Sequence, residues 1–545
     1  MVFSIGIDLG TSNCCISICD HAYNRAVVKF GEDELLESAV NFANPERVVV
    51  GSIKAYRPQD FLDGNVVLCN KRILGRLFND PDIQEVIKNC EAKVVTDSDG
   101  FCAYYIPKMD RIVSTEEVLV ELIRKLYDAA LGQSEGAIPE SVCITVPVTF
   151  NQKQRYITRK AAEKVIKNCP IRLISEPSAA AIEYSLSTSI QNGHILIYDL
   201  GGGTFDVSII RITNGNHYEI LGTSGHPTIG GNCFDERLKE HIRLKFEGDD
   251  CQDCLEPTGD ESKQVYRSAM LKLRNMCRIN KEDLSCHADT VFCVDEFFSY
   301  LKECRKAERN ASSNAYYDDS DNYDDSDGIE NDPITIIRTD FERLITQDIK
   351  TTIDLTKECI ERCGLSKHDI DRILLVGGSS YIPLVKKLLR KEFGERKIGA
   401  DINPSTCVAR GASLIGQYGF NSITEKNHLF ITDRTIYGIG IEYKRKGKLK
   451  IMIPPNTKLP VETRHDFNIN KHNKAEFVKC KVYEVSNTGE NRLIRTIRVK
   501  TDPFFESDGK IGVVFKLSKE GELTIEYKDK DDKIIQRETS ILELV

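Results

Sequence analysis

Two segments far apart in the chain share the order Asp-Leu-Gly followed by hydroxyl residues, and this repeated pattern limits the possible folds most strongly. Each follows an apolar, strand-like run, and a third such run ends in a related glycine turn. The three segments are Asp8-Leu9-Gly10-Thr11-Ser12-Asn13, Asp199-Leu200-Gly201-Gly202-Gly203-Thr204-Phe205-Asp206 and Val376-Gly377-Gly378-Ser379-Ser380. Small residues let backbone N–H groups point at an anion, while carboxylates suit hydrated Mg²⁺ and hydroxyls suit phosphate oxygens. The pattern predicts a duplicated fold that faces one nucleotide.

A different kind of nucleotide site is excluded at the same time. The sequence contains no GxxxxGK[ST] loop, so a Walker-type ATPase does not fit.

Strand-like runs alternate with helical patterns over residues 1–420. The predicted strands include 5–9, 142–146, 195–200, 207–211 and 373–376, and the predicted helices include 115–131, 152–167, 233–246 and 341–363. Alternation of this kind predicts α/β layers with a largely parallel sheet.

The remainder of the chain has a different periodicity. Apolar and polar residues alternate in segments 435–443, 448–453, 477–483, 493–499, 511–517 and 522–527, and turn residues separate them. This pattern predicts an all-β sandwich of about eight strands over residues 429–545. Residues 421–428 are short and polar, which is typical of a linker between domains.

Composition narrows the class of protein. The chain has 545 residues, a net charge of −9 and 29% charged residues, which argues against direct nucleic-acid binding or a membrane-surface role. It shows no secretory signal and no apolar run of membrane-spanning length. An odd count of 19 cysteines fits cytoplasmic thiols rather than disulfides. Cys251 and Cys254 form a CxxC pair without a regular second pair, so free thiols fit better than zinc.

An acidic stretch interrupts the first region. Residues 310–333 contain no Lys or Arg but eight Asp or Glu side chains, together with many Ser and Asn. The spacing of the acids lacks the ligand pattern of an EF-hand calcium loop. Mutual repulsion and low hydrophobicity therefore predict a disordered insertion.

Seven segments resemble the signature segments of the Hsp70 chaperone family, in the family's order. They are IGIDLGTSN (5–13), NKRILGR (70–76), TVPVTFNQKQR (145–155), LISEPSAAAIEY (173–184), YDLGGGTFDVSI (198–209), IGGNCFDERL (229–238) and LLVGGSSYIP (374–383). Actin and sugar kinases share the phosphate loops but not this complete set, and a sandwich has no role in a sugar kinase. The resemblance implies a two-lobed actin-like ATPase domain with duplicated ribonuclease-H-like cores, followed by a peptide-binding β-sandwich.

The resemblance also implies roles for individual residues. Asp8 and Asp199 would surround Mg²⁺ through its waters, with K⁺ as a further candidate ion. Lys71 would be the catalytic lysine, and Glu176, Asp199, Thr204 and Asp206 would complete the catalytic set around ATP or ADP. The nucleotide-binding residues would include Gly10, Thr11, Ser12, Asn13, Gly201, Gly202, Gly203, Thr204, Gly230, Gly231, Gly377, Gly378 and Ser379. Phosphoryl transfer needs such positioning and charge neutralisation rather than a covalent nucleophile.

The adenosine side departs from the family. Residues at the positions that face adenine and ribose are Arg274, Asn275 and Arg278, and Tyr381 replaces a stacking arginine. An aromatic face can still stack on a base. These changes are expected to affect affinity and base selectivity more than catalysis.

Residues that connect the domains in the family also have counterparts here. Pro147 and Arg155 resemble the relay between nucleotide and peptide domains, and Arg172 matches a position that faces the J-domain. Ile439, Ile441 and Val478 are candidates for the floor of the peptide pocket, although a core role fits each equally well. The loop Tyr443-Lys444-Arg445-Lys446-Gly447-Lys448 is basic where the family has an apolar arch. It should favour acidic or polar partners.

The predicted function is that of a divergent, monomeric Hsp70-type chaperone without the α-helical lid, which hydrolyses ATP slowly to control binding of unfolded or nascent polypeptides. A J-domain co-chaperone and a nucleotide exchange factor would be partners, and the ribosome is a further candidate. The alternative is a non-cycling adaptor that binds ATP with little or no hydrolysis. The set Lys71, Glu176, Asp199 and Asp206 favours the enzyme, whereas the altered adenosine site favours the adaptor.

Overall fold

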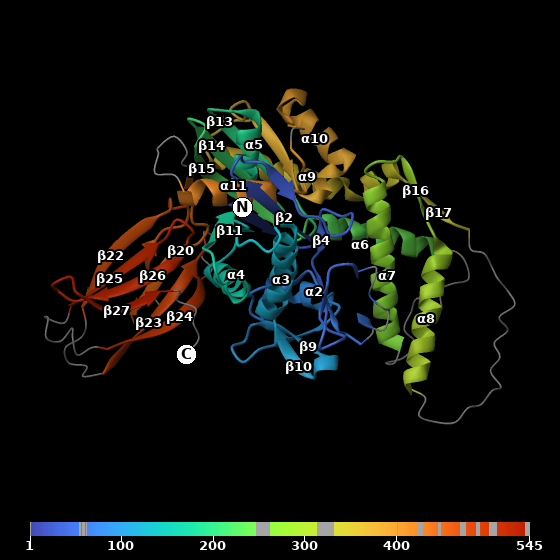
Figure 1. The fold of residues 1–545 in the computed structure, drawn as a ribbon, viewed down its shortest axis with the longest axis horizontal. Coiled ribbons are helices and arrows are strands. Elements are labelled where there is room, and N and C mark those ends of the chain that lie inside the picture. The colour runs from blue at the N-terminus through green and yellow to red at the C-terminus, as the bar shows by residue number, and fades with distance from the viewer. Residues whose placement is uncertain are drawn as a thin grey trace.

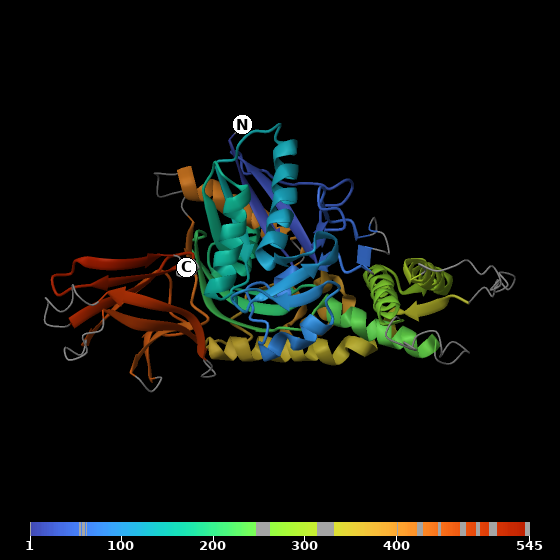
Figure 2. The same cartoon turned by 90° about the horizontal axis from the view of Figure 1, so that it is seen from below.

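The computed structural model describes residues 2–53, 56, 60–61, 63–246, 262–312, 332–399, 402–421, 429–444, 448–468, 476–486, 491–500 and 510–539. Two α/β lobes lie together, and a β-sandwich adjoins them at one end (Figure 1). Helices α7 (Ser262–Asp283) and α8 (Val294–Ser312) stand at the opposite end in both views (Figure 2). The CxxC pair Cys251 and Cys254 lies outside the described residues.

The first lobe is built on a six-stranded sheet with the order β12-β11-β1-β2-β3, in which β4 also pairs with β2. Its strands are β1 (Phe3–Leu9), β2 (Asn13–Asp20), β3 (Arg25–Val27), β4 (Leu36–Glu37), β11 (Ser141–Val146) and β12 (Ile171–Ser175). Every residue of β11 is buried, as expected for a strand covered on both faces. Helices α3 (Thr115–Gln133) and α4 (Gln152–Val165) each begin at a capping box, formed by Ser114 with Glu117 and by Asn151 with Gln154.

The second lobe repeats the central arrangement of the first. Its sheet has the order β18-β13-β14-β15-β19. The strands are β13 (Gly193–Leu200), β14 (Phe205–Thr213), β15 (His217–His226), β18 (Arg372–Val376) and β19 (Phe430–Thr432). In each lobe the strand that ends in Asp-Leu pairs antiparallel with the next strand and parallel with a later one. The duplication predicted from the sequence is therefore present in the fold.

The prediction of a largely parallel sheet was wrong, because both main sheets are mixed. Strands β1 and β2 form an antiparallel hairpin, and so do β13 and β14. A turn of a few residues can join only antiparallel neighbours, since a parallel crossover needs a dozen residues or more. The two glycine segments are these short turns, so the loops expected to hold phosphate are hairpin tips.

Smaller elements complete the two lobes. The first lobe adds β5 (Ala39–Asn41), β6 (Val49–Val50), β7 (Val66–Leu68), η2 (Asn70–Arg72), η3 (Pro81–Ile83), α2 (Gln84–Lys88), β8 (Lys93–Thr96), β9 (Cys102–Ile106), η4 (Pro107–Met109), β10 (Arg111–Ser114) and α5 (Glu176–Thr188). The second adds α6 (Gly231–Phe246), β16 (Asp289–Phe292), β17 (Ile334–Ile337), α9 (Arg338–Arg362), η6 (Gly378–Tyr381), α10 (Pro383–Phe393) and η7 (Glu395–Lys397). Helix α11 (Cys407–Asn421) packs on α5 and β1.

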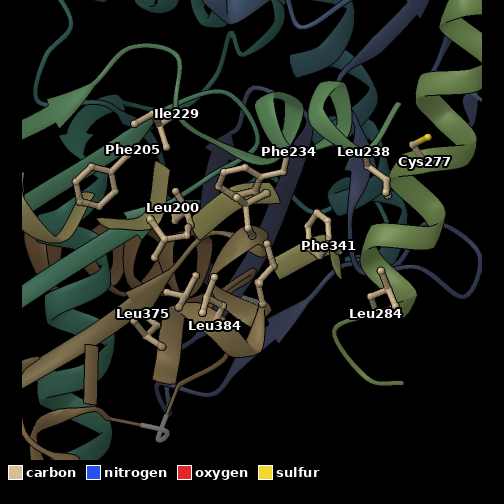
Figure 3. Close-up of a cluster of buried hydrophobic side chains, with 14 of the residues drawn as sticks. Leu200, Phe205, Ile229, Phe234, Leu238, Cys277, Leu284, Phe341, Leu375 and Leu384 are labelled. Carbon is tan, nitrogen blue, oxygen red and sulfur yellow. The ribbon is translucent and has the colours of Figure 1, made fainter. Parts of the chain in front are cut away.

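A buried apolar cluster fixes the second glycine loop from behind. Leu200 and Phe205, which flank the loop, are fully buried, and they lie with Ile229, Phe234 and Leu375 in one core (Figure 3). Burying a side chain of this size contributes about 1.5–3 kcal/mol. Because the loop ends are anchored on both sides, the backbone between them has a defined path.

The sandwich consists of two four-stranded antiparallel sheets with the orders β21-β20-β23-β24 and β22-β25-β26-β27. The strands are β20 (Gly438–Lys444), β21 (Lys448–Ile453), β22 (Val461–Asn468), β23 (Phe477–Val485), β24 (Asn491–Lys500), β25 (Lys510–Leu517), β26 (Leu523–Lys528) and β27 (Ile534–Thr539). The inward-facing residues form one core around Phe515 and Tyr527. The all-β architecture agrees with the alternation seen in the sequence.

Two domain boundaries differ from the predicted ones. Residues Phe430–Thr432, expected in the sandwich, form β19 and extend the sheet of the second lobe by pairing with β15. Helix α8 continues to Ser312, so residues 310–312, which were expected to be disordered, are helical. Residues 313–331 and 422–428 lie outside the described residues. None of the helices in the described ranges is long and apolar enough to cross a membrane.

Candidate functional site

A cleft of about 790 Å³ lies where the three glycine segments meet. Most of the residues predicted to bind nucleotide line it. They are Asp8, Gly10, Thr11, Ser12, Asn13, Lys71, Glu176, Asp199, Gly201, Gly202, Thr204, Asp206, Gly231, Arg278, Gly377, Gly378, Ser379 and Tyr381. Residues from strands, turns and helices of both lobes therefore line one cleft. A single ligand bound between the two similar lobes would contact both of them.

The glycine segments fit against one another so closely that side chains have no room. A Cβ atom at Gly202 would lie 2.1 Å from Oγ of Ser12, so the first loop fills the space beside the second. At Gly377 the backbone has a φ of 81°, and a Cβ would lie 2.4 Å from the carbonyl oxygen of Leu200. Ser379 Oγ donates a hydrogen bond of 2.9 Å to the carbonyl of Gly201. The three segments thus form one interlocked surface.

Gly203 and Gly230 belong to this surface without lining the cleft. Gly203 packs its backbone on Thr11, and Gly230 lies against the backbone of Gly202 and Gly203. The N–H of Gly231 donates to the carbonyl of Gly201 at 2.9 Å, at the start of helix α6. These contacts hold the second loop in place beneath the cleft.

One ammonium group lies among four carboxylates at the bottom of the cleft. Lys71, in η2, places its Nζ 2.6 Å from Oε1 of Glu176, which begins helix α5. Asp8 accepts a hydrogen bond of 3.0 Å from Thr145 Oγ1, and Asp206 accepts one of 3.1 Å from Thr204 Oγ1. The hydroxyl groups orient the carboxylates, and Lys71 neutralises part of their charge.

Burial changes the protonation of these acids. It raises the pKa of Asp8 to about 7. The negative charge of Glu176 raises this pKa further, whereas the positive charge of Lys71 lowers it. Burial and Glu176 likewise raise the pKa of Asp206 to about 6. The pKa of Asp199 lies well above its usual range, because the group is buried and faces Glu176, Asp206 and Asp8. Such an excess of buried negative charge fits a cation.

The arrangement fits a hydrated metal ion rather than one ligated directly by the protein. Within the described ranges, no group of three or more His, Cys, Asp or Glu side chains is close enough to hold a metal ion. Mg²⁺ commonly keeps several waters and is held by one or two carboxylates together with substrate phosphates. Asp8 and Asp199, which end the equivalent strands β1 and β13, provide that kind of partial site.

The adenosine side differs from what the sequence predicts. Tyr381 does line the cleft with a half-exposed ring, and its hydroxyl donates to Asn403 Oδ1 at 3.0 Å. Arg274 and Asn275 do not line the cleft, although they lie on helix α7. Arg274 instead pairs with Glu91 at 2.8 Å, and Arg278 pairs with Glu37 at 2.7 Å. The partners are in the first lobe, far away in the sequence, so no local pattern indicates them.

Comparison with known proteins decides the family. The family described as Hsp70 protein matches residues 4–542. The chain belongs to the Hsp70 family. It is an ATP-dependent molecular chaperone of the Hsp70 type, an ATPase that binds nucleotide and unfolded polypeptide.

Three relatives show how evenly this similarity extends along the Hsp70 chain. A ribosome-associated molecular chaperone of Saccharomyces cerevisiae is 30% identical over 539 residues, which are 97% of this chain and 80% of that protein. The chaperone protein DnaK of Carsonella ruddii is 28% identical over 540 residues, with 98% and 82% covered. The heat shock 70 kDa protein of Neurospora crassa is 28% identical over 504 residues, with 91% and 70% covered. All three carry chaperone or heat-shock names, which does not favour the non-cycling adaptor.

In this Hsp70, the residues expected to connect the domains lie between the cleft and the sandwich. Pro147 lies beside Glu176 and Asp206. Arg155, on helix α4, donates to the carbonyl oxygens of Phe150 at 3.2 Å and Glu520 at 3.4 Å, and the latter belongs to the sandwich. Arg172 lies half-buried on β12. Pro147 therefore lies beside the cleft, and Arg155 contacts the sandwich.

The candidate peptide-contact residues of the Hsp70 sandwich divide into two groups. Ile439 and Ile441 are 1% and 2% exposed and pack in the sandwich core, so in this conformation they cannot contact a peptide. Val478 is half-buried at the edge of the same core. Of the basic loop, Lys444 and Lys448 form opposing strand ends, and residues 445–447 lie outside the described residues.

Two contacts in this Hsp70 were missed by sequence reasoning. Thr145 orients Asp8, and its position as a hydroxyl residue within a buried strand was a usable signal. Asp433 accepts hydrogen bonds from Ser178 at 3.0 Å and Ser175 at 3.3 Å, directly beside Glu176. Its sequence surroundings carry no comparable signal, because its partners lie more than two hundred residues away.

Proposed function

We propose that the cleft binds ATP with Mg²⁺ and that Lys71, Glu176, Asp199, Thr204 and Asp206 form the catalytic set. The observation that carries this proposal is the Lys71–Glu176 contact of 2.6 Å among buried carboxylates. A lysine held in this way does not serve as a solvated surface charge, and its ammonium group in a nucleotide cleft is suited to meet developing negative charge.

The protein groups would divide the work between positioning and charge neutralisation. Lys71 would stabilise the charge that develops on the transferred phosphoryl group. Glu176 and Asp206 would accept hydrogen bonds from the attacking water, and Thr204 would keep Asp206 oriented. Asp8 and Asp199 would hold the hydrated metal, which supplies positive charge to the phosphates. Tyr381 would offer its ring to the base.

Turnover of Lys71→Ala provides the test. We expect hydrolysis to fall by at least about a hundredfold while ATP affinity changes little, because Lys71 acts on the transition state. Lys164→Ala is the matched control, since this lysine is exposed and pairs with Glu116 at 2.7 Å away from the cleft. Equal turnover of Lys71→Ala and wild type would show that the catalytic assignment is wrong.

The partners are proposed from membership of the Hsp70 family together with the position of Arg155. Arg155 is suited to pass changes at Pro147 to the sandwich, since it bonds to backbone carbonyls on both sides. Arg172 is the proposed contact for a J-domain co-chaperone, and the second lobe is the proposed site for a nucleotide exchange factor. Association with the ribosome is a further proposal, since the name of the yeast relative describes that protein as a ribosome-associated molecular chaperone. Stimulation of turnover by a J-domain protein, and its loss in Arg172→Ala, would test this arrangement.

A further inference from the structure

Two cysteines lie one helical turn apart at the end of helix α9, which packs on strand β15. Cys359 belongs to the last turn of the helix, and Cys363 is the residue at its C-cap. Residues four apart project from the same face of a helix, so the two side chains are neighbours. Cys359 is 1% exposed, whereas Cys363 is half-buried. Solvent therefore has access to the pair from the side of Cys363.

The end of the helix and strand β15 hold Cys363 in a defined position. Gly364 follows it with a φ of 71°, and the N–H of Leu365 donates to the carbonyl of Ile360 at 3.2 Å, as in a Schellman motif. On the other side, a Cβ atom at Gly222 of β15 would lie 2.5 Å from Sγ of Cys363. The sulfur therefore occupies space that a side chain at position 222 would otherwise fill.

The surroundings favour a thiolate on Cys363 and a thiol on Cys359. The thiol of Cys359 donates a hydrogen bond to the sulfur of Cys363, and this bond lowers the pKa of Cys363. Burial acts in the opposite direction, but the positive charges of Arg362 and Arg434 lower the pKa of Cys363 further. The same hydrogen bond, together with burial, raises the pKa of Cys359. The negative end of the helix dipole disfavours a thiolate here, so the hydrogen bond and the two arginines offset it.

Both arginines are themselves held by backbone carbonyls of strand β15. Arg362 donates to the carbonyl of Thr223 at 3.3 Å, and Arg434 donates to that of Ile220 at 2.9 Å. Arg434 also bonds to the sandwich. In Figure 2, helix α9 runs along the lower edge of the molecule towards the sandwich. The thiol pair and its arginines therefore lie where the second lobe meets the sandwich.

We propose that Cys359 and Cys363 form a site of reversible oxidation by hydroperoxides, in which Cys363 reacts first and Cys359 then closes a disulfide. The thiolate sulfur of Cys363 attacks one oxygen of the hydroperoxide, the O–O bond breaks, and the leaving oxygen takes a proton from water. The sulfur of Cys359 attacks the resulting sulfenic acid, the S–O bond breaks, and hydroxide leaves with the thiol proton as water. Two thiols become one disulfide, the hydroperoxide is reduced to an alcohol and water, and a thiol reductant reverses the change.

One turn of helix matches the span of a disulfide. Cα atoms four residues apart in a helix are separated by about 6 Å, within the range of about 4.4–6.8 Å that disulfides bridge. The N–H of Cys363 is shared between the carbonyls of Cys359 at 3.2 Å and Ile360 at 3.1 Å, so the last turn is already tightened. The inference does not depend on the proposed nucleotide site.

Trypsin makes the disulfide visible, because Arg362 lies between the two cysteines. Reduced full-length protein is treated with a small excess of hydrogen peroxide, blocked with iodoacetamide and digested without reductant. A disulfide joins peptides 358–362 and 363–367, which are otherwise separate. Peptide 282–302 is the internal control, since it carries the exposed Cys286 and Cys293.

We expect the joined peptides to form at least about fivefold faster than the control peptide is oxidised, because the thiolate is the reactive form of cysteine. Dithiothreitol should separate them again. Oxidation of peptide 282–302 while residues 358–367 stay reduced would overturn the proposal. Overoxidation of Cys363 to sulfinic acid with Cys359 still reduced would overturn it as well, because no disulfide would then form.

Single variants establish which sulfur reacts first. Dimedone traps sulfenic acids, so we expect an adduct on Cys363 in Cys359→Ser and none on Cys359 in Cys363→Ser. Wild type should give the disulfide with little adduct, because the second sulfur competes with the trap. An adduct on Cys359 with none on Cys363 would contradict the assigned order.

A third readout isolates the hydrogen bond from the disulfide. The rate at which iodoacetamide alkylates Cys363 is followed against pH. Cys359→Ala removes the donor, so the rise in rate should move to higher pH, whereas Cys359→Ser keeps a hydroxyl donor and should stay closer to wild type. Identical profiles for wild type and Cys359→Ala would show that Cys359 does not stabilise the thiolate and would contradict the proposed pair.

Discussion

At the scale of single residues, the cleft contains more carboxylates than cationic groups to balance them. Buried Glu176 lies in the cleft with Asp8, Asp199 and Asp206, which are partly buried, and with the ammonium group of Lys71. Burial raises the pKa of Asp8 to about 7 and that of Asp206 to about 6. The protein without metal and nucleotide therefore retains protons that the unfolded chain would release.

This retention predicts how stability depends on pH. Between about pH 4 and pH 7 the folded protein binds more protons than the unfolded chain, so stability without ligand must fall as pH rises. Each such carboxyl contributes up to about 1.4 kcal/mol per pH unit within its window. Thermal unfolding in a chelating buffer at several pH values should show Tm decreasing up to about pH 7. Addition of Mg²⁺ and ADP should reduce this slope.

Neutral substitutions identify the groups responsible. Asp8→Asn with Asp206→Asn removes two of the raised titrations and should reduce the pH dependence, whereas Glu358→Gln, an exposed position on helix α9, should not. A double variant with the slope of wild type would contradict the assignment of raised pKa values to these carboxyls.

The residues of the cleft were predictable from sequence to different degrees. Asp8, Thr204 and Asp206 stand at strand ends beside glycine turns, and the chemistry of phosphate and metal demands such neighbours. Arg274 and Arg278 were assigned to adenosine, but each pairs with an acid more than a hundred residues away. A contact at that sequence separation depends on how two lobes meet, and no local pattern encodes it.

At the scale of elements, the hairpin β20–β21 carries positive charge at its tip. Lys444 and Lys448 occupy partner positions at the ends of the two strands, and the sequence between them adds Arg445 and Lys446. A cluster of positive charge attracts acidic polypeptides. We predict that peptide binding is weak, depends on salt and favours acidic sequences, because the Debye length falls to ~3 Å near 1 M salt.

Fluorescence anisotropy with matched acidic and aliphatic heptapeptides at low and high salt is the measurement. Lys444→Gln with Lys448→Gln should weaken binding of the acidic peptide. Lys530→Gln, exposed in the turn between β26 and β27, is the control. Tight binding of the aliphatic peptide that ignores salt would refute the electrostatic interpretation.

The acidic insertion is a second element with a testable role. Its flanking elements α8 and β17 lie in the part of the second lobe that is remote from the glycine loops (Figure 1). Replacing residues 313–331 with a Gly/Ser linker should leave ATP affinity unchanged within error. A large loss of affinity, measured by titration calorimetry, would show that the segment has a structural role.

Elements were easier to predict than their connections. The periodicity of helix α3 and of strands β1 and β13 was visible because burial imposes it. Strand direction was not visible, so the mixed sheets differed from the expected parallel ones. The three residues of β19 were too short for a pattern, and their partner strand β15 lies about two hundred residues earlier in the chain.

At the scale of the whole molecule, one carboxylate connects the ATPase domain and the sandwich. Glu219 on β15 lies 3.1 Å from Arg434 and 2.6 Å from Lys458, and it also pairs with Arg211 of its own lobe. Burial alone would raise its pKa, but the hydrogen bonds from Lys458 and Arg211 lower it to about 2. The group thus stays charged at every physiological pH, and pH cannot release the sandwich through it.

Substitution of this carboxylate should loosen the docking of the sandwich. Glu219→Gln weakens both contacts to the sandwich, so we predict a larger radius of gyration in small-angle X-ray scattering. Arg211→Ala is the matched control, since it removes the cation of the same lobe and leaves Arg434 and Lys458 in place. Equal radii for wild type and Glu219→Gln would show that other contacts, such as Gln152 with Glu484, are sufficient.

The close fit of Ser12 against Gly202 has a consequence for how the two halves can diverge. A Cβ at position 202 would lie 2.1 Å from Oγ and 2.9 Å from Cβ of Ser12, so neither loop has room to grow while the other stays as it is. Substitutions at positions 12 and 202, one in each of the two similar halves, are therefore expected to be coupled. Among descendants of this chain, a side chain at position 202 should be found only together with a glycine at position 12.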